Sequence, residues 1–245
     1  MTLLINNSYL IDEKDLMLVE LGSTVYDTVN DKMYIVLAPG ALTEINLEAM
    51  SVGSVEELVE AIAAGGVVSL SEDIDAPSAI SITTDSTVKL NNKTISISED
   101  TAGDGVFKAT EGTLTLEGKG TVNGVGNNDW NMAIWATDNG KVIINDGLYT
   151  NEGATAEVDP AHFDLIYASG NGQIEINGGE FKCETPKWTL NIKDKDRETA
   201  SIVVKGGKFH GFDPSNCETE GPNTNFVAEG YKVVEENGVF VVMPE

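Results

Sequence analysis

The sequence predicts an all-β protein built as a parallel β-helix, a solenoid in which short strands stack coil upon coil. Two observations predict this class: a ten-residue motif that recurs along the chain, and the lack of a convincing helical pattern after residue 66. The motif reads GKVIINDGLY at 140–149, GQIEINGGEF at 172–181 and ASIVVKGGKF at 200–209, and an earlier variant, GTLTLEGKGTV, begins at Gly112. Each copy is a β-branched strand that ends at glycines and is followed by a large apolar residue.

The spacing of the motif limits the architecture. Gly118 and Gly147 are 29 residues apart, Gly147 and Gly179 are 32 apart, and Gly179 and Gly207 are 28 apart. A helix-free repeat of this length does not fit leucine-rich repeats, which carry a leucine/asparagine ladder, or propeller blades, which need four strands each. A parallel β-helix remains, with coils stacked about 4.8 Å apart.

Each coil is expected to contain two strands. Residues 133–136 lead into the copy at 140, and residues 165–168 lead into the copy at 172, with a tight corner between the strands and a glycine corner after them. Irregular inserts at 124–131 and 151–162 are expected to leave the stack as loops. Six aliphatic residues are predicted to point inward and stack as ladders: Val142, Ile144, Ile174, Ile176, Ile202 and Val204.

One clear helix precedes the repeat. Ser54 and Glu57 form a capping box, apolar residues recur at helical spacing from Val55 to Ile62, and Gly65 and Gly66 stop the helix. A solenoid leaves an open edge at each end, so this helix is predicted to cover the N-terminal end. The stretch 225–234 followed by 238–242 is predicted to form a closing hairpin. The expected domains are an anchor at 1–50, a capping helix at 51–66 and a β-helix at 67–245.

The first fifty residues differ from the repeat in their residue pattern. Two apolar alternating stretches flank a predicted hairpin turn at Asn30 and Asp31. Fifty residues with few aromatics form a weak core alone, so this segment is expected to dock on a partner. The candidate anchor residues are Val25, Tyr26, Tyr34 and Ile35.

The composition excludes several function classes. The 245 residues carry a formal net charge of −25, which repels phosphate backbones and anionic membranes, so no nucleic-acid or membrane partner is expected. No stretch approaches the length of a transmembrane helix, and the first residues lack the basic region of a secretory signal. Cys183 and Cys217 are interpreted as two unpaired thiols.

Polysaccharide cleavage is the sharpest chemical hypothesis that the residues allow. Hydrolysis by a carboxylate pair needs two acids about 5–10 Å apart across a groove. One loop offers Asp159, His162 and Asp164, and another offers the glycan-binding candidates Asn128, Asp129 and Trp130. The alternative is that acid pairs arise in loops without function, because the chain has 40 acidic residues. No enzyme activity is therefore expected.

Other candidate residues are interpreted as structural. Trp135 lies within a predicted strand and is expected in the core or at a corner, and Arg197 is expected in a solvated turn. His162 and His210 have no partners at zinc-ligand spacing, so no metal and no cofactor is expected. Calcium at Glu72, Asp73 and Asp75 stays possible without an EF-hand pattern.

The chain resembles a known family from about residue 54 to residue 245. The runs SVEEL…GGVVSLSEDID at 54–75, VKLNNKTI at 88–95 and NFVAEGYKV at 225–233 are similar to the capping helix, an early coil and the ending of pectate-lyase-like right-handed β-helix proteins. Such modules occur in surface proteins of gut bacteria and in fibres and decorations of their phages. The resemblance implies a right-handed β-helix and leaves the function open.

The segment at 22–36 is similar to strand–turn–strand segments of phage head and tail fibres. This resemblance implies a virion structural protein, assembled in the host cytoplasm as a head fibre or capsid-decorating fibre. Its expected partners are two further copies in a homotrimer, the capsid through residues 1–50, and a cell-surface glycan. The alternatives are a polysaccharide-degrading depolymerase or lyase, and a bacterial surface adhesin.

Overall fold

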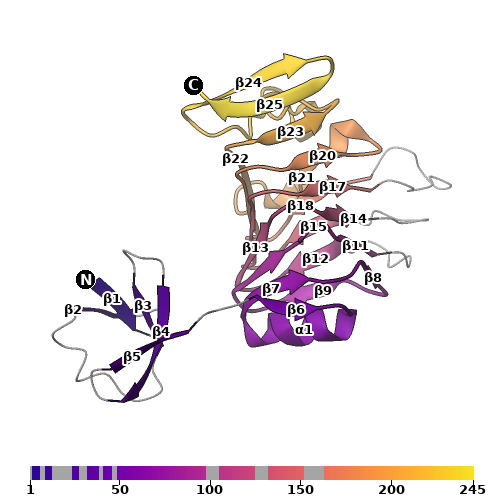
Figure 1. Cartoon of the computed structure of the whole chain (residues 1–245). Helices are drawn as coiled ribbons and strands as arrows, with labels where there is room; N and C mark the ends of the chain where they lie inside the picture. The colour runs from indigo at the N-terminus through magenta and orange to yellow at the C-terminus, as the bar shows by residue number, and fades with distance from the viewer. Residues whose placement is uncertain are drawn as a thin grey trace. The chain divides into compact units, whose positions relative to one another are not determined.

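The computed structural model describes residues 2–5, 9–12, 24–27, 32–38, 41–45, 49–97, 105–124, 132–151 and 163–245. The chain divides into two compact units, Met1–Glu48 and Ala49–Glu245. Figure 1 shows the strands of both units.

The first unit contains a five-stranded antiparallel sheet, called sheet A. Its strands lie in the order β2-β1-β3-β4-β5, and neighbours in sequence form hairpins on both sides of β3. Val25 lies opposite Tyr34 and Thr24 lies opposite Ile35, so the candidate anchor residues occupy two paired strands. Their role as an anchor stays a prediction. The bounds are β1 Thr2–Ile5, β2 Tyr9–Asp12, β3 Thr24–Asp27, β4 Lys32–Ala38 and β5 Ala41–Ile45.

The second unit opens with strand β6 (Met50–Val52) and helix α1 (Val55–Ala64). The hydroxyl of Ser54 accepts the amide of Glu57 at 3.3 Å, and the carboxylate of Glu57 accepts the amide of Gly53 at 2.8 Å. These bonds satisfy donors that the first turn of a helix leaves free. The predicted helix is confirmed, and the packing of its buried face on the first strands of the repeat is compatible with a cap.

Three parallel sheets form the body of this unit (Figure 1). Sheet B contains β6 and then β7 Gly66–Leu70, β10 Ser86–Lys89, β13 Thr113–Glu117, β16 Lys141–Ile144, β19 Gln173–Ile176 and β22 Ser201–Val204. Sheet C contains β8 Ile74–Ala76, β11 Thr94–Ile97, β14 Thr121–Asn123, β17 Leu148–Thr150, β20 Glu180–Lys182 and β23 Gly207–His210. Sheet D contains β9 Ile80–Ile82, β12 Gly105–Ala109, β15 Met132–Ala136, β18 Ile166–Ala168 and β21 Leu190–Ile192.

From β7 to β23, successive strands belong to sheets B, C and D in turn. From β10 on, each of these strands pairs in parallel with the strand three places earlier, which lies in the same sheet. This order is compatible with a solenoid. The prediction of two strands per coil is wrong, because a third strand follows the glycine corner. Strands β17, β20 and β23 are only three or four residues long, and each carries one fully buried aromatic residue, so the alternation that signals a strand is too brief to read.

The register also corrects one alignment. Thr121 lies opposite Leu148, so Gly120 and not Gly118 occupies the position of Gly147 in the next coil. Both Gly118 and Gly120 have positive φ angles, so both meet the conformational requirement of a corner, and the sequence alone does not separate them.

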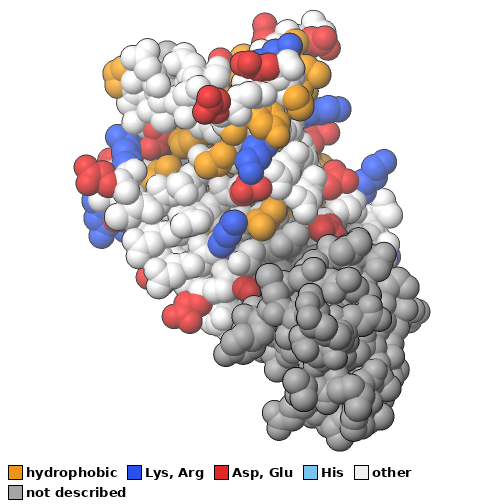
Figure 2. Space-filling model, turned by 90° about the vertical axis from the view of Figure 1, so that its left-hand side faces the viewer, with side chains coloured by type: hydrophobic (Ala, Val, Ile, Leu, Met, Phe, Trp, Pro, Cys, Tyr) orange, Lys and Arg blue, Asp and Glu red, His pale blue; other side chains and the backbone are white. Residues whose placement is uncertain are grey.

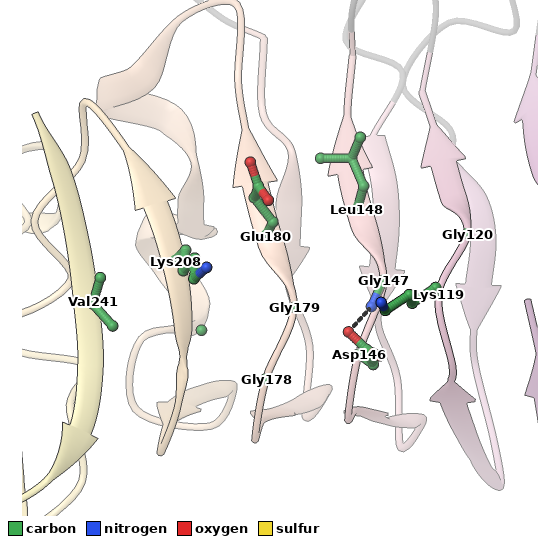
Figure 3. Close-up of a pocket in the computed structure, with 11 residues that line it drawn as sticks. Lys119, Gly120, Asp146, Gly147, Leu148, Gly178, Gly179, Glu180, Lys208 and Val241 are labelled. Carbon is green, nitrogen blue, oxygen red and sulfur yellow. Dashed lines mark hydrogen bonds between the residues drawn. The ribbon is translucent and has the colours of Figure 1, made fainter. Parts of the chain in front are cut away.

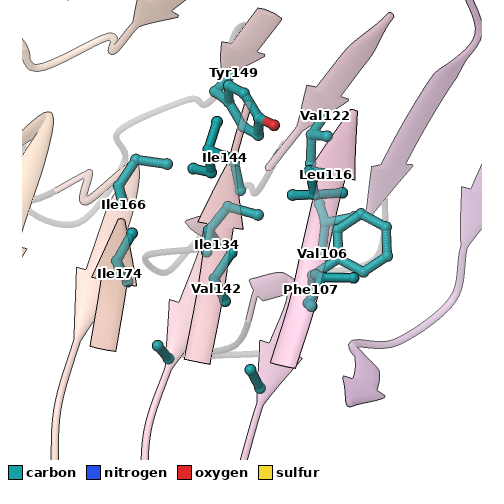
Figure 4. Packing of buried hydrophobic residues seen from close by; sticks show 14 of the residues in the cluster. Val106, Phe107, Leu116, Val122, Ile134, Val142, Ile144, Tyr149, Ile166 and Ile174 are labelled. Atoms are coloured by element: carbon teal, nitrogen blue, oxygen red, sulfur yellow. The ribbon is translucent and has the colours of Figure 1, made fainter. Parts of the chain in front are cut away.

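The core runs along the axis of the three sheets (Figure 4). All six residues predicted to point inward are at most 4 % exposed, which confirms the aliphatic ladders. An aromatic stack lies beside them: the rings of Tyr149 and Phe181 are 5.1 Å apart, and those of Phe181 and Phe209 are 4.7 Å apart and nearly parallel. Stacked aromatic pairs add about 0.5–1.5 kcal/mol beyond the burial of their area.

The C-terminal end is closed by an antiparallel hairpin. Strands β24 (Tyr231–Glu236) and β25 (Val239–Pro244) pair with each other, and β25 pairs antiparallel with β23. The hairpin begins at Tyr231 and not at residue 225, because the residues at 226 and 227 bond to sheet B instead. Val227 makes a parallel bridge to Val204, and the amide of Val204 donates to the carbonyl of Phe226 at 2.8 Å.

Candidate functional site

A row of large side chains crosses the outer side of sheet D. The register places Lys108 beside Trp135, Trp135 beside Tyr167, and Tyr167 beside Asn191 on four consecutive strands. Successive residues of a strand point to opposite faces. The neighbours of this row in each strand, such as Ile134 and Ala136, belong to the core, so the row lies on the side of the sheet away from it.

Trp135 is the centre of this row. The ammonium group of Lys108 lies 4.1 Å from the Trp135 ring centroid, and the Tyr167 ring lies 6.0 Å away on the next strand. The indole nitrogen of Trp135 donates to the hydroxyl of Ser169 at 2.9 Å. The prediction of a core or corner position for Trp135 is wrong, because it is partly exposed and belongs to the outer row. An aromatic residue in an otherwise apolar strand gives no sequence signal of which face it occupies.

A groove of about 510 Å³ continues this row toward the C-terminal end. Tyr167 and Asn191 supply one wall, and Trp188, from the 3-10 helix η2 (Pro186–Trp188), supplies another. Lys193 and Lys195 are exposed at its rim. Apolar and aromatic walls with a few polar groups are typical of ligand sites.

Asp164 is the buried acid of the groove. Asp164 is 3 % exposed and lines the groove. Its Oδ1 accepts a hydrogen bond from the side-chain Nδ2 of Asn191 at 2.8 Å. Burial raises the pKa of Asp164 from 3.8 to about 7; the Asn191 bond opposes this shift and the charge of Glu220 adds to it. The cause is desolvation, because a carboxylate loses its hydration when it is buried. Burial, and then the charge of Asp164, likewise raises the pKa of Tyr167 to about 12, so its hydroxyl stays neutral.

Arg197 lies in an exposed turn, as the sequence predicts, but its guanidinium is paired there with two acids. Its Nε donates to the buried carboxylate of Glu220 at 3.0 Å, and its Nη2 donates to Asp194 at 2.8 Å. Asp194 begins the 3-10 helix η3 (Asp194–Asp196), and Glu220 ends the 3-10 helix η4 (Glu218–Glu220). The guanidinium therefore joins two turns beside the groove.

The sequence-predicted site residues are only partly described. Asp164 lies in the groove, whereas Asp159, His162, Asn128, Asp129 and Trp130 lie outside the described residues. Sequence reasoning missed Tyr167, Trp188 and Asn191. Tyr167 and Asn191 occupy outward positions next to core residues, and only the register of sheet D brings them together.

A second depression, of about 610 Å³, lies on sheet C (Figure 3). Its floor is a column of glycines that includes Gly147 and Gly179, and its sides carry charges of both signs such as Lys208 and Glu180. The glycines have a structural explanation. A Cβ at Gly147 would lie 2.8 Å from Leu90 and 3.4 Å from the Tyr149 ring, so these positions stay bare because the core lies beneath them.

Figure 2 shows the side of the molecule that faces left in Figure 1, where apolar side chains gather toward the C-terminal end. In the last strands of sheets B and C, Val203, Val234 and Met243 are 36 %, 37 % and 42 % exposed. Charged side chains are interspersed, and Glu175 pairs with Lys205 at 3.0 Å across two strands of sheet B.

The described acids do not gather into a metal centre. No group of three or more His, Cys, Asp or Glu side chains that could hold a metal ion occurs in the described part of the chain. Among the acids considered for calcium, Asp73 accepts the amide of Thr94 at 2.7 Å, and Asp75 accepts the hydroxyl of Ser96 at 3.3 Å. Within the same residues, no helix has the length and apolar character needed to span a bilayer.

Comparison with protein-family models, with curated protein sequences and with solved structures found no significant match to this chain.

Proposed function

We propose that the second unit is a right-handed parallel β-helix that binds a cell-surface glycan in the groove of sheet D. The observation that carries this proposal is the meeting of Tyr167, Trp188, Asn191 and Asp164 around one groove, in line with Trp135. Sugar rings have apolar faces that pack on aromatic rings and hydroxyl groups that bond to polar side chains. Right-handedness follows the general preference of parallel crossover connections.

In this proposal the chain is a phage virion structural protein, and its β-helix carries the glycan site. A head fibre or capsid-decorating fibre needs an attachment segment and a projecting body, and the division into residues 1–48 and 49–245 suits that arrangement. Residues 1–50 would contact the capsid, and three copies would associate. Light scattering on the full chain tests the association, since a monomer would contradict a trimeric fibre.

Glycan binding is tested with Trp188→Ala on an array of immobilised microbial polysaccharides. Loss of the aromatic wall is expected to weaken binding about 10-fold or more, because a stacked aromatic contributes about 1–3 kcal/mol. Met243→Ala is the matched control, since it removes an exposed apolar side chain far along the sequence on β25. Equal binding by the two variants would contradict the assignment of the groove.

Depolymerase activity is the second candidate, and the raised pKa of Asp164 is the observation that favours it. A carboxylic acid that keeps its proton near neutral pH can protonate a leaving oxygen. In this case Asp164→Asn would abolish the shortening of a polysaccharide, measured by size-exclusion chromatography, while the wild type shortens it. Unchanged chain length with the wild-type protein would retire this candidate.

A further inference from the structure

We propose that Asp164 is the specificity-determining residue of the groove: its protonated carboxyl group donates a hydrogen bond to an oxygen of a neutral sugar, and ionisation of the group removes this bond. This inference rests on the proposed glycan site. It differs from acid catalysis, because the proton is held for binding and is not transferred.

The surroundings of Asp164 favour the neutral acid. Asp164 is 3 % exposed, and within the described ranges its hydrogen-bond partner is Asn191. The only arginine, Arg197, is bonded to Glu220 and Asp194 instead. A buried carboxylate without a cation is costly to ionise, so the proton stays on the carboxyl group.

Among the described residues, the other charged groups around Asp164 act in the same direction or lie at the rim of the groove. Glu220, from η4, adds negative charge that disfavours a second anion. Tyr167 and the buried thiol of Cys183 face the same region and stay neutral, since burial raises the pKa of both groups. Asp194 is held by Arg197, and Asp196 accepts the amide of Gly170 at 2.8 Å. Lys193 and Lys195 are exposed.

The hydrogen bond from Asn191 determines which oxygen of Asp164 carries the proton. One oxygen of Asp164 accepts from Asn191, so the proton belongs on the other oxygen, beside a groove walled by Tyr167 and Trp188. A donor in an apolar groove must find an acceptor when a ligand displaces water. A sugar hydroxyl or ring oxygen supplies that acceptor, whereas the carboxylate of an acidic sugar would meet the field of Glu220 and Asp194.

The proposal predicts that the affinity for the glycan depends on the protonation of Asp164. Affinity should fall about 10-fold between pH 6 and pH 8, because the ionised acid cannot donate. Asp164→Asn should bind with a flat pH profile, since its amide oxygen can accept from Asn191 and its amide nitrogen can donate at any pH. Asp164→Ala should bind weakly throughout. Glu229→Gln, at an exposed position, should follow the wild type.

The experiment measures these four proteins on the polysaccharide array at pH 6, 7 and 8, with neutral and uronate-containing polymers. A pH-dependent wild type beside a pH-independent, binding-competent Asp164→Asn supports the proposal. Binding that has the same pH profile in both, or a preference for uronates, overturns it and leaves the glycan site in place. No binding by the wild type to any polymer refutes the proposed function, and this inference falls with it.

Discussion

The carboxylate of Glu220 lies 2.8 Å from the amide nitrogen of Ile192, on the last strand of sheet D. In the preceding coils, strand amides of this sheet donate to backbone carbonyls of neighbouring strands. At Ile192 a side chain supplies the acceptor, and Arg197 balances its charge. The end of this sheet is thus closed by one buried acid.

Removal of this acid should destabilise the C-terminal coil. Glu220→Ala leaves the Ile192 amide and the Arg197 guanidinium without their acceptor, and we expect a loss of about 2–3 kcal/mol in the free energy of unfolding. Urea denaturation measures this loss. Glu229→Ala, at an exposed position, is the control, and an equal denaturation midpoint for the two variants would show that Glu220 does not close the sheet.

The stability of the protein should fall as pH rises from about 4 to about 7. The folded protein holds the proton of Asp164 up to a pKa of about 7, whereas the unfolded chain releases it near 3.8, so the unfolded state binds fewer protons in this range. Asp164→Asn removes this term and should be more stable than the wild type at pH 8 by at most about 4 kcal/mol.

Melting temperatures at pH 5 and pH 8 give this comparison. Glu220 also has a raised pKa, mainly from burial, so a smaller decline should remain in Asp164→Asn. A wild type that is as stable at pH 8 as at pH 5 would contradict the buried, protonated state of Asp164.

The glycine corners should differ in how they tolerate alanine. Gly147 and Gly230 both have positive φ angles, 110° and 81°, but a Cβ at Gly147 would lie 2.8 Å from Leu90, whereas none of the atoms around Gly230 is within 4 Å. Gly147→Ala therefore combines strain with overpacking and should cost about 1–3 kcal/mol more than Gly230→Ala. Equal urea midpoints would mean that the core yields easily at this corner.

The aromatic stack should be most sensitive at its middle ring. Phe181→Ala removes the contacts to Tyr149 and Phe209 together and should cost about 3–5 kcal/mol, whereas Phe181→Leu should cost less, because it retains apolar volume. Thermal denaturation distinguishes the two variants. If leucine cost as much as alanine, ring stacking and not burial would dominate.

The strands of sheet B were predictable because their signal is strong. Ile174 and Ile176 alternate with polar residues over a full strand that ends at glycines, which identifies both the strand and its inward face. Helix α1 was predictable from the capping box at Ser54 and the apolar spacing after it. Both signals are local, so the sequence contains them completely.

The groove was not predictable, because the contacts that form it are not local in the sequence. Asp164, Trp188 and Asn191 lie within 28 residues of each other but are joined only by the parallel register of sheet D and by a 3-10 turn. The partner of Arg197 likewise lies 23 residues further along, in another turn. Contacts of this kind depend on the number of residues in each corner, which no residue pattern specifies.

The two ends of the stack have a consequence for the size of the particle that this chain can form. Parallel coils could in principle continue from one molecule into the next, as in a fibril. Here α1 covers the first coil, and at the other end the direction reverses at β25 and β24, whose exposed edge carries Lys232, Glu235 and Glu236. Both ends of the described stack therefore differ from a bare parallel strand, which disfavours the end-to-end addition of a second molecule.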